Sequence, residues 1–174
     1  MTRARPPMPD LPPDAQRAAA ERLAAEIAAE PPELQRWMCF TLAGGTYALN
    51  VLQLREVLPR VTVEPVPGAP PAVRGVLNLR GEIVTLLDLR HWLDLPAGTD
   101  DGPVLVLEHA GQSLGLRVDA VGALLKRMPD DLLAPAETAS PRLAALTCGR
   151  TTDGGETLTL VDGAALLADT AQGG

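Results

Sequence analysis

The sequence predicts an all-β fold, a barrel or a sandwich, that follows a separate N-terminal leader. Three observations indicate it: many short runs rich in Leu, Val and β-branched residues, turn signals between most of them, and a weak internal repeat. The chain has 174 residues, which is enough for one medium domain with a core that needs no covalent staples. Aromatic residues make up only 2 % of the chain, so we expect an aliphatic core.

Residues 1–35 form a Pro/Ala-rich leader that we expect to lie outside the domain, partly helical or disordered. Its first residues hold several prolines, which favour an extended chain. Residues 14–30 are rich in Ala, Glu and Arg and predict a helix with Asp14 as its N-cap, ended by Pro31 and Pro32. The apolar stripe of this helix is thin, so the sequence favours a solvated, marginal helix over one that docks on the domain.

The domain is expected to span residues 36–170, with a disordered tail at 171–174. Glycine, proline and aspartate separate most of its apolar runs, which is typical of strands joined by turns. The expected strands are Met38–Leu42, Thr46–Val51, Glu56–Val66, Val73–Leu79, Glu82–Leu87, Val104–Glu108, Ser113–Val118, Leu143–Arg150 and Glu156–Val161.

Only single helical turns are expected between these strands. Asp88 precedes the segment Leu89–Leu93, and Asp162 precedes Gly163–Leu167. An aspartate side chain at this position accepts a hydrogen bond from the first free backbone N–H groups of a helix. We therefore interpret Asp88 and Asp162 as structural caps.

The chain repeats itself weakly. Glu82–Leu93 aligns with Glu156–Leu167, and Ala48–Leu58 aligns with Gly115–Leu125. The first pair of segments is set further apart than the second, and a longer connection at Lys126–Ser140 takes up the difference. Two related β-units that meet across a pseudo-two-fold axis are the expected result, and residues that only one half carries are candidates for function.

Two charged residues of the first half have no counterpart in the second. Arg80 aligns with Gly154, and Glu56 aligns with Ala123. The fold therefore does not require either charge, which makes both candidates for partner binding.

Composition and charge exclude several classes of protein. The formal net charge is −7 with no basic face, which argues against nucleic-acid binding and against binding to anionic lipid. No apolar run approaches the roughly 20 residues of a membrane span, and no signal peptide is evident, so the expected compartment is the cytoplasm. Cys39 and Cys148 are far apart and are expected to be reduced, buried thiols rather than zinc ligands or a disulfide.

No recognisable catalytic, cofactor or metal site is present. The loops LLDLR and LVDGA around Asp88 and Asp162 lack the Asp-Thr/Ser-Gly signature of aspartic proteases. His91 and His109 have no Ser or Cys nucleophile in a recognisable setting and are expected on the surface. A binding protein is favoured; an enzyme that depends on the two aspartates, or a barrel with a small-ligand cavity, remain the alternatives.

Three motifs resemble the CheW family of chemotaxis coupling proteins. The run VPGAPPAVRGVLNLRGEIVTLLDLRHWL is similar to the family's hallmark segment, and TYALNVLQLREVL and GLRVDAVGALL resemble its flanking motifs. The resemblance covers Trp37 to about Asp169. Thr85 departs from it, because the family usually has proline there, and the leader lies outside it.

The resemblance implies two SH3-like five-stranded β-barrels with a shared core. It also implies an adaptor, without enzymatic activity or cofactor, recruited to membrane-associated receptor arrays. Its partners would be the CheW-like regulatory domain of a CheA-type histidine kinase and the cytoplasmic tip of methyl-accepting chemoreceptors. The partner-binding residues would be Arg80 and Asn78 of the NLRG motif, Glu56, and Leu54 and Val57 in an apolar groove between the barrels.

Overall fold

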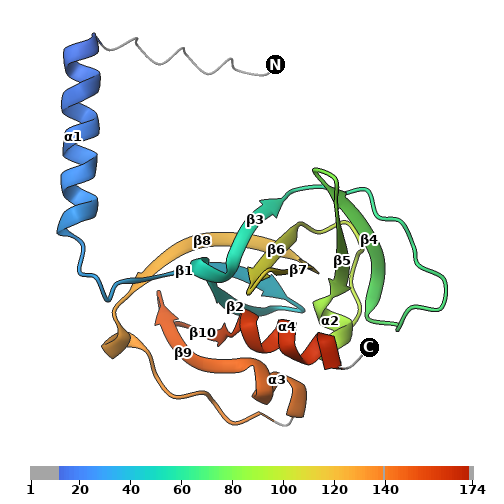
Figure 1. Ribbon diagram of the computed structural model, residues 1–174. Coiled ribbons are helices and arrows are strands. Elements are labelled where there is room, and N and C mark those ends of the chain that lie inside the picture. The colour runs from blue at the N-terminus through green and yellow to red at the C-terminus, as the bar shows by residue number, and fades with distance from the viewer. Residues whose placement is uncertain (1–11, 139, 173–174) are drawn as a thin grey trace, which may run out of the picture. The chain divides into compact units, whose positions relative to one another are not determined.

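The computed structural model describes residues 12–138 and 140–172 and separates into two compact units, Met1–Leu34 and Gln35–Gly174. Helix α1 (Pro13–Ala29) belongs to the first unit (Figure 1). None of its residues is buried. The predicted cap at Asp14 is wrong: Pro12 is the N-cap residue and Asp14 lies in the first turn. Proline suits the first helical turn because that turn has N–H groups without intrahelical partners anyway. The leader's first eleven residues lie outside the described part of the chain.

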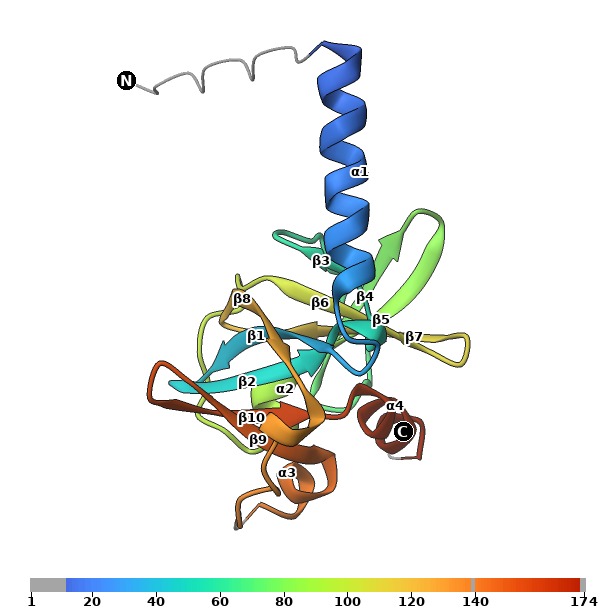
Figure 2. The ribbon, with the colours of Figure 1, turned by 90° about the vertical axis from the view of Figure 1, so that its left-hand side faces the viewer.

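The second unit contains two five-stranded sheets (Figures 1 and 2). Sheet A has the strand order β8-β1-β2-β10-β9, and sheet B has the order β3-β6-β7-β5-β4. Short helical segments lie between some of the strands and after the last one. The strands are β1 Gln35–Leu42, β2 Gly45–Asn50, β3 Leu54–Leu58, β4 Val73–Leu79, β5 Glu82–Asp88, β6 Val104–His109, β7 Gln112–Arg117, β8 Ala120–Arg127, β9 Thr147–Asp153 and β10 Glu156–Val161, and the helical segments are η1 Val51–Gln53, α2 Leu89–Trp92, η2 Pro129–Asp131, α3 Pro141–Leu146 and α4 Gly163–Gln172.

The two sheets have the same plan and exchange hairpins. The first-half hairpin β1–β2 lies in sheet A beside β8, β9 and β10, whereas the second-half hairpin β6–β7 lies in sheet B beside β3, β4 and β5. The exchange is made through two parallel pairs, β2 with β10 and β5 with β7. The aligned segments of the sequence repeat thus occupy matching positions. Neither sheet corresponds to one half of the sequence, however, because each sheet contains strands from both halves.

Closure of either sheet into a barrel is not confirmed. Among the described residues, the outer strands β3 and β4 do not pair with each other, and neither do β8 and β9. Within that part of the chain, the backbone pairing between the segment after one outer strand and the opposite outer strand is limited to single bridges, Glu64 to Val76 and Leu133 to Arg150. These segments contain prolines such as Pro65 and Pro135, which cannot donate to a ladder.

The core consists of three apolar clusters. The largest contains residues of both sheets together with α2, α3 and α4, and a smaller cluster lies against the other face of each sheet. In β6 the side chains alternate: Leu105 and Leu107 join the shared cluster, while Val104 and Val106 join the cluster of sheet B. Central strands such as β6 are therefore buried on both faces, and their sequences are continuous apolar runs. The expected aliphatic core is largely present, but the few aromatics are buried in it too, with Phe40 stacked on Tyr47.

Five sequence-based expectations for secondary structure and burial need correction. The expected strand Glu56–Val66 is observed as β3, Leu54–Leu58, which ends before Pro59, a residue that cannot donate a hydrogen bond to a strand ladder. Strand β8 was missed because it is an outer strand with mostly exposed side chains and no clear alternation. The expected strand Leu143–Arg150 begins as helix α3, capped by the Ser140 hydroxyl, and only then becomes β9. Helix α4 runs to Gln172 rather than forming one turn. Cys39 is buried as expected, but Cys148 is exposed because β9 is also an outer strand; both thiols are free.

Candidate functional site

The β4–β5 turn presents Arg80 at the end of an outer hairpin. Arg80 and Gly81 have φ angles of 51° and 87°, as do Gly154 and Gly155 at 57° and 83° in the matching turn of sheet A. Two-residue hairpin loops of this kind need positive φ at both positions, which glycine adopts without strain. Arginine at such a position is uncommon, so the fold itself does not select it.

Asn78 holds this turn together. Its side-chain Oδ1 accepts a hydrogen bond from the Gly81 backbone N at 2.8 Å. The side chain is exposed, but its carbonyl oxygen is already engaged. The structure therefore gives Asn78 a local role in shaping the turn that carries Arg80.

A β-bulge in β3 decides which way the candidate residues point. The pairing with β6 shifts between Leu54 and Glu56, so that Leu54 faces Leu107 and Glu56 faces Val106. As a result Leu54 and Val57 both pack, half-buried, against the shared core cluster. The extra residue of the bulge turns Glu56 to the opposite face of the sheet.

Glu56 and Arg80 form a two-pronged ion pair. Arg80 Nη1 donates to Glu56 Oε1 at 3.0 Å, and Nη2 donates to Oε2 at 3.2 Å. The Glu56 side chain is 20 % exposed and that of Arg80 is 72 % exposed. The pair links outer strand β3 to the turn of β4–β5, the two elements between which sheet B has no strand pairing. The two residues singled out by the repeat are thus brought together.

A second ionic group lies beside this pair. Arg55, in the bulge, donates to Glu82 Oε2 at 2.6 Å and lies 3.5 Å from Glu108 Oε2. The hydrogen bond from Arg55 holds the pKa of the Glu82 carboxyl below its ordinary value. The rim of sheet B near Arg80 is therefore charged, and each of these arginines is paired with a glutamate of the same rim.

Two apolar side chains near these charges are exposed, and the sequence reasoning missed both. Ile83 is 64 % exposed in β5 and is the register partner of Asn78, and Leu52 is 91 % exposed in η1, just before β3. A signal was available for Ile83, because the alternation of buried Val84 and Leu86 places it on the other face. Ile83 thus lies exposed in the same β4–β5 hairpin that carries Arg80.

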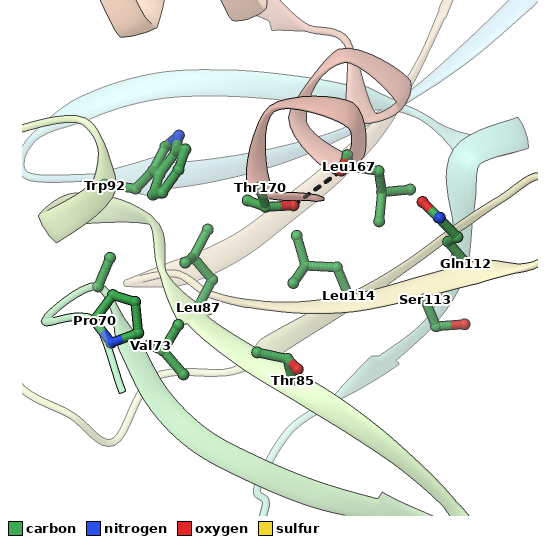
Figure 3. A pocket seen from close by; sticks show the side chains of 11 residues that line it. Pro70, Val73, Thr85, Leu87, Trp92, Gln112, Ser113, Leu114, Leu167 and Thr170 are labelled. Carbon is green, nitrogen blue, oxygen red and sulfur yellow. Dashed lines mark hydrogen bonds between the residues drawn. The ribbon is translucent and has the colours of Figure 1, made fainter. Parts of the chain in front are cut away.

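An apolar pocket of about 360 Å³ opens on the face of β5 that carries Ile83, because Thr85 and Leu87, which alternate with Val84 and Leu86, line it. Figure 3 shows Leu87 and Leu114 of the sheet facing Leu167 and Thr170 of α4, with Trp92 at one end. Leu54 and Val57, which we expected in a groove between the sheets, do not line this pocket. Thr85, the residue that departs from the family pattern, does.

The carboxylates of Asp88 and Asp162 both accept backbone hydrogen bonds at helix starts. Asp88 Oδ1 accepts from Arg90 N at 3.0 Å, and Asp162 Oδ1 accepts from Ala164 N at 3.0 Å. Asp162 Oδ1 also accepts a hydrogen bond from Gln53 Nε2 at 2.8 Å.

Asp88 does more than cap a helix. Its side chain is 3 % exposed, and its Oδ2 accepts from Arg74 Nη2 at 2.8 Å. The buried guanidinium of Arg90 lies 3.7 Å from Oδ1. Burial raises the pKa of Asp88, but the Arg74 hydrogen bond and the charges of both arginines outweigh it, so the pKa lies below the ordinary 3.8. Neither Arg74 nor Arg90 could be assigned this contact from the sequence.

Comparison with known proteins now decides the family. Residues 36–171 match the CheW-like domain family. The chain belongs to the CheW-like family.

Individual relatives agree with this assignment. The chain is 29 % identical over 136 residues to the chemotaxis protein CheW of Klebsiella aerogenes, which covers 77 % of this chain and 82 % of that protein. It is 33 % identical over 108 residues to the protein PilI of Pseudomonas aeruginosa, which covers 58 % of each chain. The crystal structure of the scaffolding protein TtCheW from Thermoanaerobacter tengcongensis superposes with a TM-score of 0.67 at 25 % identity, over 73 % of this chain and 88 % of that one.

CheW-like proteins are scaffold and adaptor proteins of chemotaxis signal transduction and not enzymes. In the part of the chain that the structure describes, no helix is long and apolar enough to cross a membrane. The same residues contain no group of three or more His, Cys, Asp or Glu side chains placed to hold a metal ion.

The turn geometry leads to a prediction about stability. Arg80→Gly should change the free energy of unfolding by less than about 1 kcal/mol, because relief of the left-handed backbone offsets an exposed ion pair worth about 0–1 kcal/mol. The matched control is Gly154→Arg, which places arginine in the same backbone conformation in the half of the repeat where Ala123 aligns with Glu56, and it should lose about 1–2 kcal/mol. Urea unfolding measures both. If Arg80→Gly lost as much stability as Gly154→Arg, or more, the fold would depend on this arginine.

Proposed function

We propose that this CheW-like protein is a cytoplasmic adaptor that couples chemoreceptors to a CheA-type histidine kinase in a receptor array at the membrane. The match of residues 36–171 to the CheW-like family carries the proposal. We further propose that each curled sheet, with the apolar cluster it encloses, corresponds to one of the SH3-like barrels that the family resemblance implies.

The partner surface proposed here centres on the outer edge of sheet B. Among the residues that the structure describes, strand β3 pairs with β6 alone, so its other edge is not part of a ladder there. Such an edge, flanked by the Glu56–Arg80 pair and by exposed Ile83, offers backbone, ionic and apolar contacts together. Glu56 and Arg80 would make the ionic contacts, and Asn78 would fix the turn that presents them.

The receptor tip requires an apolar contact. Leu54 and Val57 are half-buried at the edge of the shared core and remain our candidates for it. The pocket between β5, β7 and α4 supplies a second apolar feature, large enough to take one or two side chains of a helical hairpin. Individually weak contacts of this kind suit an array, in which clustering supplies avidity.

Removal of residues 1–34 tests both the function and the position of the leader. The truncated protein should stay folded and bind the kinase regulatory domain with an affinity within about twofold of the full chain, because α1 contributes no buried residue. Titration calorimetry with the two proteins measures this, and circular dichroism serves as the folding control.

Two outcomes would count against these claims. A truncated protein that unfolds would show that the leader supports the domain. A full-length protein that binds neither the kinase regulatory domain nor a receptor tip fragment would remove the coupling function, whatever the truncation does.

A further inference from the structure

Arg117 is a buried arginine whose charge is not matched locally. It ends strand β7 and is 7 % exposed, and its Nε has no hydrogen-bond partner. In the register its nearest acidic neighbour is Asp88 on β5, but that carboxylate already receives Arg74 and lies beside Arg90. No carboxylate of the described residues lies within ion-pair distance of Arg117. A buried guanidinium in this state is costly, so the position calls for an explanation.

The Arg117 side chain lines a cavity of about 480 Å³. Arg60 lies exposed at the rim, and Val61 and Val63 form one wall. The other rim carries Asp100 and Asp101. Asp100 is 3.5 Å from Arg74. The pKa of Asp101 is lowered first by a hydrogen bond from Thr99 and only then by the more distant charges of Arg117 and Arg60. The two arginines therefore face a polar cavity in which neither has a close anionic partner among the described residues.

An arginine with a structural role lies at the opposite end of the strands of the same sheet. There Arg55 is paired with both Glu82 and Glu108. Two residues beyond the aligned segments Ala48–Leu58 and Gly115–Leu125, Arg127 stands at the position that matches Arg60. Arg127 donates to Thr152 O and Asp153 Oδ1. Arginines that hold this fold together are thus bonded to it.

The repeat also shows that the fold does not need arginine at position 117. Its counterpart in the first half is Asn50, whose side chain accepts a hydrogen bond from Leu52 N and caps η1. Asparagine therefore fits the same place at the end of the matching strand. Arg117 is a feature of one half only, placed where it costs stability.

We propose that the cavity between Arg60 and Arg117 binds a carboxylate group. The planar guanidinium fork matches a carboxylate with two parallel hydrogen bonds, and an anion here would neutralise the buried charge. Asp100 and Asp101 at the rim repel a doubly charged anion more than a singly charged one, which favours a carboxylate over phosphate. The carboxylate is either a free small acid or the side chain of an acidic residue on a partner protein.

The full-length protein provides a direct test by NMR. Sodium acetate is added at constant ionic strength against sodium chloride, and the arginine Nε–Hε resonances are followed. The Arg117 signal should shift and saturate, with a Kd on the order of 1–10 mM for so small a ligand. The Arg55 signal, from a paired arginine, is the internal control and should stay in place. An Arg117 signal that does not move with acetate or with the peptide described below overturns the proposal.

Two further probes identify the ligand. A capped tripeptide, Ac-Ala-Glu-Ala-NH₂, carries a single side-chain carboxylate; binding it more tightly than acetate points to a partner protein, and binding acetate alone points to a free acid. Either result supports the site. Inorganic phosphate should bind at least fivefold more weakly than acetate, and tighter binding of phosphate would overturn the assignment to a carboxylate.

Thermal unfolding of Arg117→Asn and Arg117→Met gives an independent check. In chloride alone both variants should melt at or above the wild-type temperature, because each removes a buried charge that lacks a close partner. Acetate at ten times its Kd should raise the wild-type midpoint by roughly 3–5 °C and leave the variants unchanged. Variants that melt several degrees lower, together with a wild type that does not respond to acetate, would show that Arg117 is structural.

Discussion

Replacing Asp88 with alanine should lower the free energy of unfolding by about 3–5 kcal/mol, which is more than loss of a helix cap alone can explain. The carboxylate is buried and joins Arg74, Arg90 and the backbone N–H of Arg90. Its removal leaves the Arg90 guanidinium, 3 % exposed, without one of its two acidic neighbours. Urea unfolding at pH 7 measures the loss.

Asp162→Ala is the matched control. Asp162 occupies the corresponding place in the repeat and caps α4, but no arginine is paired with it among the described residues. Its removal should cost only about 0.5–2 kcal/mol. Equal losses at Asp88 and Asp162 would contradict the importance of the arginine contacts.

The same carboxylate predicts a dependence on pH. Because the folded pKa of Asp88 lies below its ordinary 3.8, the ionised form stabilises the fold. This contribution is complete above the pKa of the unfolded chain and is lost as the pH falls through the lower folded value. Urea unfolding between pH 3 and pH 7 should therefore show a loss of stability towards pH 3 that is smaller in Asp88→Asn. Parallel profiles for the two proteins would assign the acid sensitivity elsewhere.

Glu56→Ala and Arg80→Ala should each weaken binding of the kinase domain or of the receptor tip by tenfold or more. At a desolvated interface the loss of one charge of a pair costs about 2–5 kcal/mol, partly because the other charge is left without its partner. Within the free protein the pair is exposed on the arginine side and is worth only about 0–1 kcal/mol. Affinity should thus fall while the melting temperature barely changes.

A double-mutant cycle follows from the geometry. The two side chains share two hydrogen bonds, so the double variant should lose less affinity than the sum of the single changes. Asp153→Ala, which breaks the ion pair with Arg127 across the outer strands of sheet A, is the control and should leave affinity within twofold. Strictly additive losses would mean that Glu56 and Arg80 make two separate contacts, and no loss in either variant would remove this surface from the proposed interface.

Much of the architecture could be predicted from local patterns. Strands such as Val73–Leu79 and Glu156–Val161 were placed at their observed bounds, because apolar runs ended by two-residue turns depend on neighbouring residues alone. The repeat correctly aligned β5 with β10 and β2–β3 with β7–β8. The outer strand β8 was not predicted because few of its side chains are buried, and a strand is recognised by the apolar residues that burial requires.

The candidate site was likewise predictable from the sequence in part. The motifs in the sequence were sufficient to identify the family, and the repeat singled out Glu56 and Arg80 as charges that only one half of it carries. Their bidentate contact depends on the β3 bulge and on the meeting of β3 with the β4–β5 turn, which no local pattern specifies. The exchange of hairpins between the sheets, the arginines around Asp88 and the unmatched charge of Arg117 were likewise decided by the tertiary structure, since all three join residues that are remote in sequence and meet only when the strands pair.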